Sequence, residues 1–119
     1  MSPINEVVII KKIFDWHFYK NDELIESYKN LKICDNTYLI NENLKLIKDK
    51  GYILERINDD YKIVIDFKTK TCTINLTKEK MFMEINLLET EIVDKEDKLT
   101  IIYKLDDDER NKLVISLKE

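Results

Sequence analysis

Short apolar runs alternate with clusters of Asn, Asp, Lys and Glu along this chain. The apolar runs number about ten and recur at the roughly 8–12-residue spacing that is typical of all-β sandwiches and barrels. Within most runs, apolar and polar residues alternate with period two, as they do in a strand that buries one face. The pattern therefore predicts an all-β fold, a single antiparallel meander β-barrel of about eight to ten strands.

The expected strands coincide with the apolar runs, and the polar clusters form the turns between them. We expect a bulge near Lys12, and a bulge or kink at Leu87 and Leu88, because the parity of the apolar positions changes there. Residues 43–57 also fit helical spacing, but Gly51 and the β-branched residues favour strands. The strands are expected over residues 6–19, 24–33, 37–40, 44–47, 52–57, 61–67, 71–76, 81–92 with an interruption at 87–88, 99–105 and 113–117.

Glycine contributes little to these turns, because the chain has one Gly and one Pro. Asn and Asp tolerate left-handed backbone angles better than other residues that carry a side chain, so they can replace glycine there. The one glycine, Gly51, lies in the expected turn 48–51, where we expect it to adopt a positive φ.

Length and composition indicate one globular domain over residues 1–119. With 44% hydrophobic residues, the chain is apolar enough to form a packed core and is not expected to be disordered. The formal net charge of -4 argues against a nucleic-acid partner, because such a partner normally requires a basic surface that neutralises phosphates.

No segment of the sequence is expected to enter or cross a membrane. The first residues lack the basic and apolar regions of a signal peptide, and no apolar run approaches about 18–20 residues. Cys34 and Cys72 are the only cysteines, and we expect them to be reduced; a Cys34–Cys72 disulfide is the less favoured alternative. These features predict a cytoplasmic protein without a membrane partner.

The usual sequence signals of catalysis and metal binding are missing. His17 is the only histidine, so we expect it on the outer face of the first strand and not in a triad or zinc site. The acidic run 106–109 lacks the spacing of a calcium loop and is expected to be a solvated turn. We therefore expect no cofactor, no metal and no enzymatic activity. A pair of carboxylates or a metal-free hydrolase site, built from distant positions, is the enzymatic alternative.

Aromatic residues form the richest group of candidate site residues. In a barrel, many of them point into one interior, which is either solidly packed or encloses a cavity for a small ligand. Arg56 interrupts an apolar strand, and its guanidinium either reaches solvent or projects into the barrel mouth, where it can pair with a carboxylate or an anionic ligand. The candidate ligand-binding residues are Trp16, Phe18, Tyr28, Arg56, Phe67 and Tyr103.

Two functions of different kinds fit these observations. The leading hypothesis is a non-catalytic binding module for a small apolar or amphipathic ligand. The alternative is a protein–protein interaction module with a solidly packed interior, a monomer or a homodimer that acts through an outer face or a strand edge. The alternative rests on apolar residues of opposite parity, which lie outside a closed barrel: Val7, Ile9, Ile102 and Val114.

The second half of the chain resembles a known family. The segments 53–56, 81–87, 99–105 and 113–117, together with Phe67, resemble the YwiB-like family of small bacterial proteins of unknown function. The first half fits more loosely, through residues 22–23, Tyr28 and residues 37–38. The chain departs from the family pattern where glycines usually stand, at residues 57–58 and 80–82. The resemblance implies a calycin-like (lipocalin-like) β-barrel and supplies no catalytic residues.

Overall fold

The computed structural model describes residues 13–118, which form an antiparallel sheet of eleven strands with no helix among them. The predicted all-β antiparallel meander is confirmed, with eleven strands instead of eight to ten. The part of the first expected strand before Ile13, with the bulge expected near Lys12, lies outside the described residues. The strands are β1 (Ile13–Lys20), β2 (Glu23–Cys34), β3 (Thr37–Asn41), β4 (Leu44–Lys48), β5 (Tyr52–Ile57), β6 (Tyr61–Asp66), β7 (Thr71–Leu76), β8 (Met81–Asn86), β9 (Glu89–Lys95), β10 (Lys98–Asp106) and β11 (Glu109–Lys118).

The additional strand arises at Leu87 and Leu88, where the sequence predicts a bulge or kink. The chain leaves β8 there and begins β9 at the opposite edge of the same sheet. The Leu87 amide donates to the Lys70 carbonyl oxygen (2.8 Å), and the Leu88 amide donates to the Lys104 carbonyl oxygen (2.9 Å). These bonds hold the connection against the turn before β7 and against β10. The parity of the apolar positions therefore changes where the chain passes from one edge of the sheet to the other.

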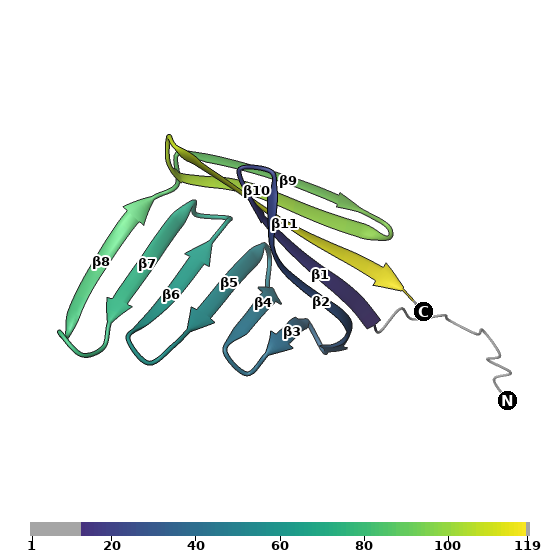
Figure 1. Ribbon diagram of the computed structural model, residues 1–119, viewed down its shortest axis with the longest axis horizontal. Coiled ribbons are helices and arrows are strands. Elements are labelled where there is room, and N and C mark those ends of the chain that lie inside the picture. Colours follow the sequence, from purple (N-terminus) through teal and green to yellow (C-terminus); the bar gives the residue numbers. More distant parts are fainter. Residues whose placement is uncertain (1–12, 119) are drawn as a thin grey trace, which may run out of the picture.

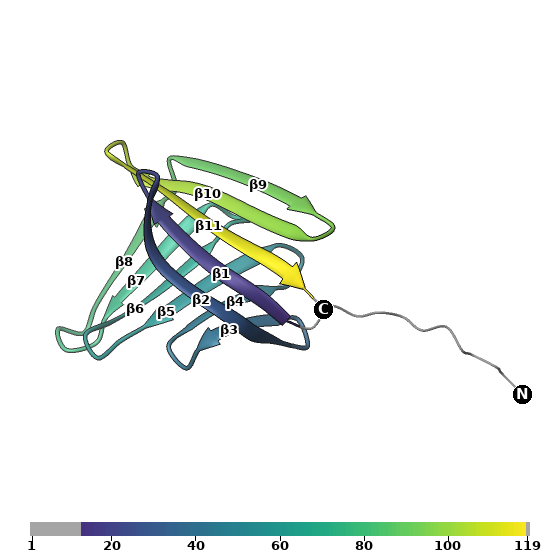
Figure 2. The ribbon, with the colours of Figure 1, turned by 45° about the vertical axis from the view of Figure 1, so that its right-hand side comes forward.

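The sheet is curled into a half-barrel (Figures 1 and 2). Its strand order is β8-β7-β6-β5-β4-β3-β2-β1-β11-β10-β9, so β8 and β9 are the two edges. Every neighbouring pair is consecutive in the chain except β1 and β11, which pair from Ile13↔Lys118 to Lys20↔Asn111. Within residues 13–118 no pairing joins β8 to β9, so the half-barrel is open along one side where a closed barrel was expected.

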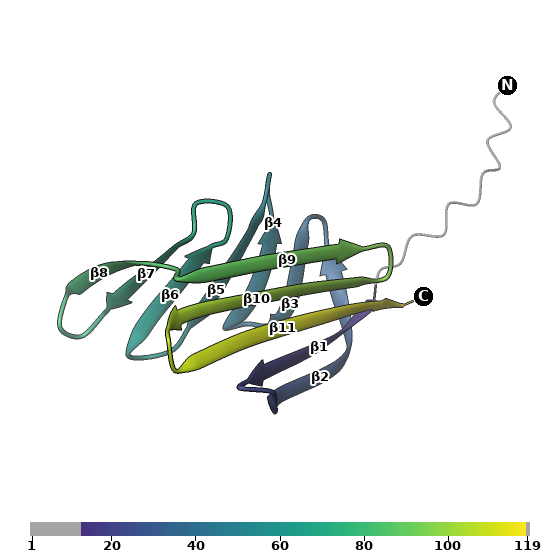
Figure 3. The ribbon, with the colours of Figure 1, turned by 90° about the horizontal axis from the view of Figure 1, so that it is seen from above.

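Strand β2 carries the sheet from one half of the half-barrel to the other. It pairs with β1 along most of its length but with β3 only at Ile33↔Tyr38 and Cys34↔Thr37. As a result, the half formed by β1, β11, β10 and β9 lies across the half formed by β3 to β8 (Figure 3). Residues 43–57, which also fit helical spacing, form β4 and β5.

Inward-facing side chains from both halves meet between them and form the core. Phe14 and Trp16 of β1 are completely buried, and the Phe14 ring contacts the Tyr38 ring edge-on, with centroids 5.3 Å apart. Burial of each such side chain contributes about 1.5–3 kcal/mol. His17 lies on the outer face of β1, as expected, where its ring stacks on that of Tyr19. The other completely buried large side chains are Leu46, Ile101, Leu113, Ile115 and Cys72.

A hydrogen bond connects the two halves near the open side. The Tyr52 hydroxyl of β5 donates to the Asp94 carboxylate of β9 (2.5 Å). Burial and this hydrogen bond both raise the pKa of Tyr52 well above its usual value, so the phenol stays protonated. The bond therefore holds edge strand β9 against β5, although the two strands are not neighbours in the sheet.

The turns use positive φ angles, but the prediction for Gly51 is wrong. The residues with positive φ include Asn21, Asp22 and Asp35, as expected, whereas Gly51 has none and its neighbour Lys50 has φ 56°. Gly51 is required for a different reason. A Cβ atom at this position would lie 2.9 Å from the Cβ of Lys68, so the close approach of two turns, and not a left-handed backbone, excludes a side chain.

The apolar residues on the outer face of β10 and β11 do not form a large exposed patch. Val114 and Ile102 have the outward parity that the sequence indicates, yet Val114 is only 8% exposed and Ile102 is half-buried. Val7 and Ile9 lie outside the described residues.

Candidate functional site

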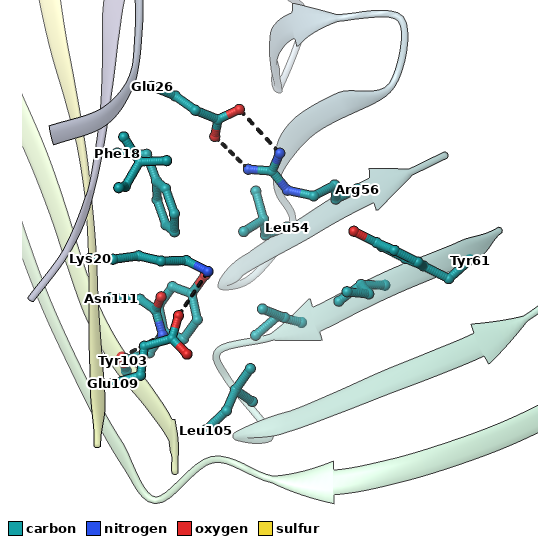
Figure 4. Close-up of a pocket in the computed structure, with 13 residues that line it drawn as sticks. Phe18, Lys20, Glu26, Leu54, Arg56, Tyr61, Tyr103, Leu105, Glu109 and Asn111 are labelled. Atoms are coloured by element: carbon teal, nitrogen blue, oxygen red, sulfur yellow. Dashed lines mark hydrogen bonds and ion pairs between the residues drawn. The ribbon is translucent and has the colours of Figure 1, made fainter. Parts of the chain in front are cut away.

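A cavity of about 350 Å³ lies between the two halves of the half-barrel (Figure 4). It is open to solvent, and both halves contribute side chains to it. Strands β1, β10 and β11 supply one wall, β5 and β6 supply the opposite wall, and β2 contributes at the rim. The lining residues are Phe18, Lys20, Ile25, Glu26, Leu54, Arg56, Tyr61, Ile63, Ile65, Tyr103, Leu105, Glu109 and Asn111.

Strand periodicity places the apolar lining. Leu54 and Arg56 share the inner face of β5 and pair with Ile65 and Ile63 of β6, which places these four side chains side by side. Leu54 and Ile65 are each 3% exposed, so the floor of the cavity is apolar and continuous with the core.

A bulge brings a further apolar side chain to the rim. The pairing of β1 with β2 passes from Phe18↔Glu26 to Tyr19↔Leu24, which leaves Ile25 as the additional residue. Ile25 is half exposed and lines the cavity. A regular strand would not place both Ile25 and Glu26 at the same rim.

Arg56 occupies the gap between β2 and β5, where no backbone pairing exists. Its guanidinium donates to both carboxylate oxygens of Glu26, at 2.6 and 3.2 Å, and lies 5.8 Å from the centroid of the Phe18 ring. The hydrogen bond to Glu26 raises the pKa of Arg56, so the guanidinium keeps its charge. Of the two orientations considered from the sequence, the side chain adopts the one that pairs with a carboxylate.

A second ion pair lies on the opposite wall. Lys20 Nζ is 2.8 Å from Glu109 Oε1, with both side chains more than a third exposed. Figure 4 shows this pair below Phe18 and the Arg56–Glu26 pair above it. The four charged groups of the cavity therefore compensate one another.

Tyr103 provides a neutral polar group deep in the cavity. The residue is 4% exposed, and its ring packs against that of Phe67 with centroids 5.2 Å apart. Burial raises the pKa of Tyr103 well above its usual value, so the hydroxyl remains neutral. Its backbone carbonyl oxygen accepts a hydrogen bond from Asn111 Nδ2 (3.4 Å).

Three of the six candidate residues from the sequence line this cavity: Phe18, Arg56 and Tyr103. Phe67 is buried and contacts the Tyr103 ring. Trp16 is completely buried in the core, where its Nε1 has no hydrogen-bond partner within residues 13–118. Tyr28 pairs with Trp16 across β1 and β2, but it is 39% exposed and does not line the cavity.

The carboxylate partners and much of the apolar wall are not among the residues that the sequence predicts for the site. A signal for Glu26 exists, because it shares the parity of Tyr28 and a half-buried arginine requires a carboxylate or another acceptor. No pattern in the sequence identifies Lys20, Glu109 or Asn111 as site residues, because they are brought together only when β1 pairs with β11.

The remaining sequence candidates lie outside the cavity. Cys34 is exposed and Cys72 is buried, and both are free thiols. In the acidic run, Asp106, Asp107 and Asp108 are exposed, and the Asp106 carboxylate accepts a hydrogen bond from the Asp108 amide (2.9 Å). No group of three or more His, Cys, Asp or Glu side chains able to hold a metal ion occurs within the described part of the chain.

No helix between residues 13 and 118 is long and apolar enough to span a membrane. Comparisons with models of known protein families, with curated proteins and with solved structures found no match.

Proposed function

We propose that this protein is a non-catalytic binding module that holds a small, uncharged amphipathic molecule in the half-barrel cavity. One observation carries the proposal: apolar side chains from both halves line an open space of about 350 Å³ instead of filling it. This volume lies within the roughly 300–1,000 Å³ of small-molecule sites, which are mostly apolar with a few polar groups.

The charges around the cavity favour an uncharged ligand. Arg56 is already paired with Glu26, and Lys20 with Glu109. An anionic ligand that took either cation would leave a carboxylate unpaired in a partly buried position, at a cost of about 1–3 kcal/mol. An uncharged molecule avoids this cost, and the neutral hydroxyl of Tyr103 can hydrogen-bond to its polar end.

Further parts of the proposal rest on the sequence. A cytoplasmic location is supported by the two free thiols, one of them exposed. The acidic net charge of -4 supports the absence of a nucleic-acid partner. Membership of the YwiB-like family is supported by the strand pattern, and the calycin-like barrel that it implies is compatible with a curled antiparallel meander.

The proposal can be tested by ligand retention and by dye binding. We expect native mass spectrometry of gently purified protein to reveal a bound small molecule that denaturation releases. We also expect the uncharged dye Nile red to bind with a Kd at least tenfold lower than that of the anionic dye 8-anilinonaphthalene-1-sulfonate. Ile63→Trp, which places a large ring in the cavity, should weaken Nile red binding at least tenfold.

Val64→Trp is the matched control, because Val64 lies on the opposite face of the same strand. It should leave Nile red binding within twofold of the unmodified protein. Circular dichroism and urea unfolding establish that both variants are folded. Equal dye binding by the two variants, or retention of the natural ligand by Ile63→Trp, would place the ligand elsewhere and refute the proposal.

A further inference from the structure

Edge strand β8 exposes apolar side chains on both of its faces. All six of its residues are exposed, and the largest exposed fractions are 66% for Phe82, 51% for Met81 and 42% for Met83. Its outer backbone edge has no neighbouring strand within residues 13–118 (Figure 1). An apolar and unpaired edge of this kind is a template for pairing with another chain.

The other edge, β9, is protected in ways that β8 is not. Strand β9 carries Glu89, Glu91, Asp94 and Lys95 among its seven residues, and charged residues on an edge oppose strand addition. Asp94 is also held by the hydrogen bond from Tyr52. Glu84 is the only charged residue of β8. The unprotected edge of this sheet is therefore β8.

We propose that β8 pairs antiparallel with β8 of a second copy of this chain. A two-fold axis perpendicular to the sheet would join the two half-barrels into one continuous sheet with both concave faces on the same side. Each β8 would gain a neighbour for its free backbone groups, and its methionines and Phe82 would gain cross-strand side-chain neighbours. This inference is independent of the ligand proposed for the cavity.

Charge complementarity selects the register of this pairing. With Glu84 at the two-fold axis, the two Glu84 carboxylates would face each other, which is destabilising. With Met83 at the axis, Glu84 would lie opposite the Phe82 ring. With Phe82 at the axis, Phe82 would lie opposite its own copy and Met81 opposite Met83.

The Phe82-centred register also creates two ion pairs. Lys80, the last residue of the turn before β8, has a φ of 52°, and this register would bring it opposite Glu84 of the second copy, with the contact repeated by the symmetry. Neither side chain has an ion-pair partner within residues 13–118. The pairing therefore places an apolar strand beside itself and pairs the charge of Glu84 with that of Lys80 in the preceding turn.

The test is the oligomeric state of the full chain as a function of concentration. Sedimentation velocity or light scattering over 1 µM to 1 mM should show a monomer–dimer equilibrium. Lys80→Glu and Glu84→Lys should each raise the dimer Kd at least tenfold, because each substitution opposes like charges at both contacts. The double variant Lys80→Glu with Glu84→Lys should restore the original Kd within about threefold, because it exchanges the two charges.

Lys32→Glu is the control for the change in net charge, because Lys32 is exposed on β2, distant from β8 in the sheet order. It should leave the Kd within twofold. Hydrogen exchange gives a second measurement, and the amides of 81–86 should become more protected as the concentration rises. A strict monomer at 1 mM overturns the proposal. A dimer that the charge reversals do not weaken, or that shows no added protection in β8, overturns it as well.

Discussion

Loss of the Arg56–Glu26 ion pair is expected to separate the two walls of the cavity. The pair spans a gap between β2 and β5 that no backbone hydrogen bond crosses, since β2 pairs with β3 only near its C-terminal end. The side chains are 31% exposed for Arg56 and 20% exposed for Glu26. They are therefore shielded from solvent much more than an ordinary surface pair.

The magnitude lies between two limits. An exposed ion pair contributes about 0–1 kcal/mol, whereas removal of one partner from a buried pair costs about 3–5 kcal/mol. The geometry here is bidentate, with N···O distances of 2.6 and 3.2 Å, but the burial is only partial. We therefore expect Glu26→Gln and Arg56→Met each to lower the free energy of unfolding by about 2 kcal/mol.

Urea unfolding of the two single variants and the double variant measures the coupling directly. The double-mutant cycle should give a coupling energy of about 1–2 kcal/mol that decreases only partly in 1 M salt, because the pair is half-buried. A coupling energy below about 0.5 kcal/mol would show that the pair behaves like an ordinary surface contact. That result would refute the idea that it holds β2 against β5.

The hydrogen bond of Tyr52 and the turn at Lys50 and Gly51 also contribute to stability. Tyr52→Phe should lower the free energy of unfolding by about 1.5–3 kcal/mol in urea titrations at pH 7, because its hydroxyl donates to a carboxylate that links β5 to β9. Since the folded-state pKa of Tyr52 is raised above the unfolded value, its contribution is complete below about pH 10 and declines as the pH rises beyond it. The unmodified protein should lose more stability between pH 9 and 11 than Tyr52→Phe, and equal losses would contradict the assignment. Gly51→Ala should cost about 1–3 kcal/mol, because its Cβ would lie 2.9 Å from that of Lys68. Lys50→Gly should not destabilise, because Lys50 has a positive φ, and a greater loss for Lys50→Gly than for Gly51→Ala would show that the turn is misassigned.

The strands could be predicted from the sequence because period two is a local property. The runs around Tyr61, Ile63 and Ile65, or Leu99, Ile101 and Tyr103, each show on their own which face is buried. The same rule failed at Leu87 and Leu88, where a parity change has two physical causes. A bulge and a transfer between sheet edges look alike in the sequence, and only the hydrogen bonds to Lys70 and Lys104 distinguish them.

The candidate site could be predicted only in part. Phe18, Arg56 and Tyr103 were identifiable because aromatic residues, and a charged residue within an apolar strand, stand out locally. Trp16 and Tyr28 were equally conspicuous but lie in the packed core and at an exposed position, respectively. Their placement depends on where the core ends and the cavity begins, which is set by the curl of the whole sheet.

The strand order is that of a circularly permuted meander, because the connection at Leu87 and Leu88 joins the two edge strands β8 and β9. Among the neighbouring strand pairs that residues 13–118 form, only β1 and β11 are distant in the chain, and every other pair is a hairpin with a short turn. In a circular permutant that begins at Leu88 and ends at Leu87, the strands would lie in the sheet in the same order as they occur in the sequence. The entropic cost of long-range loop closure among the eleven described strands is therefore concentrated in one strand pair.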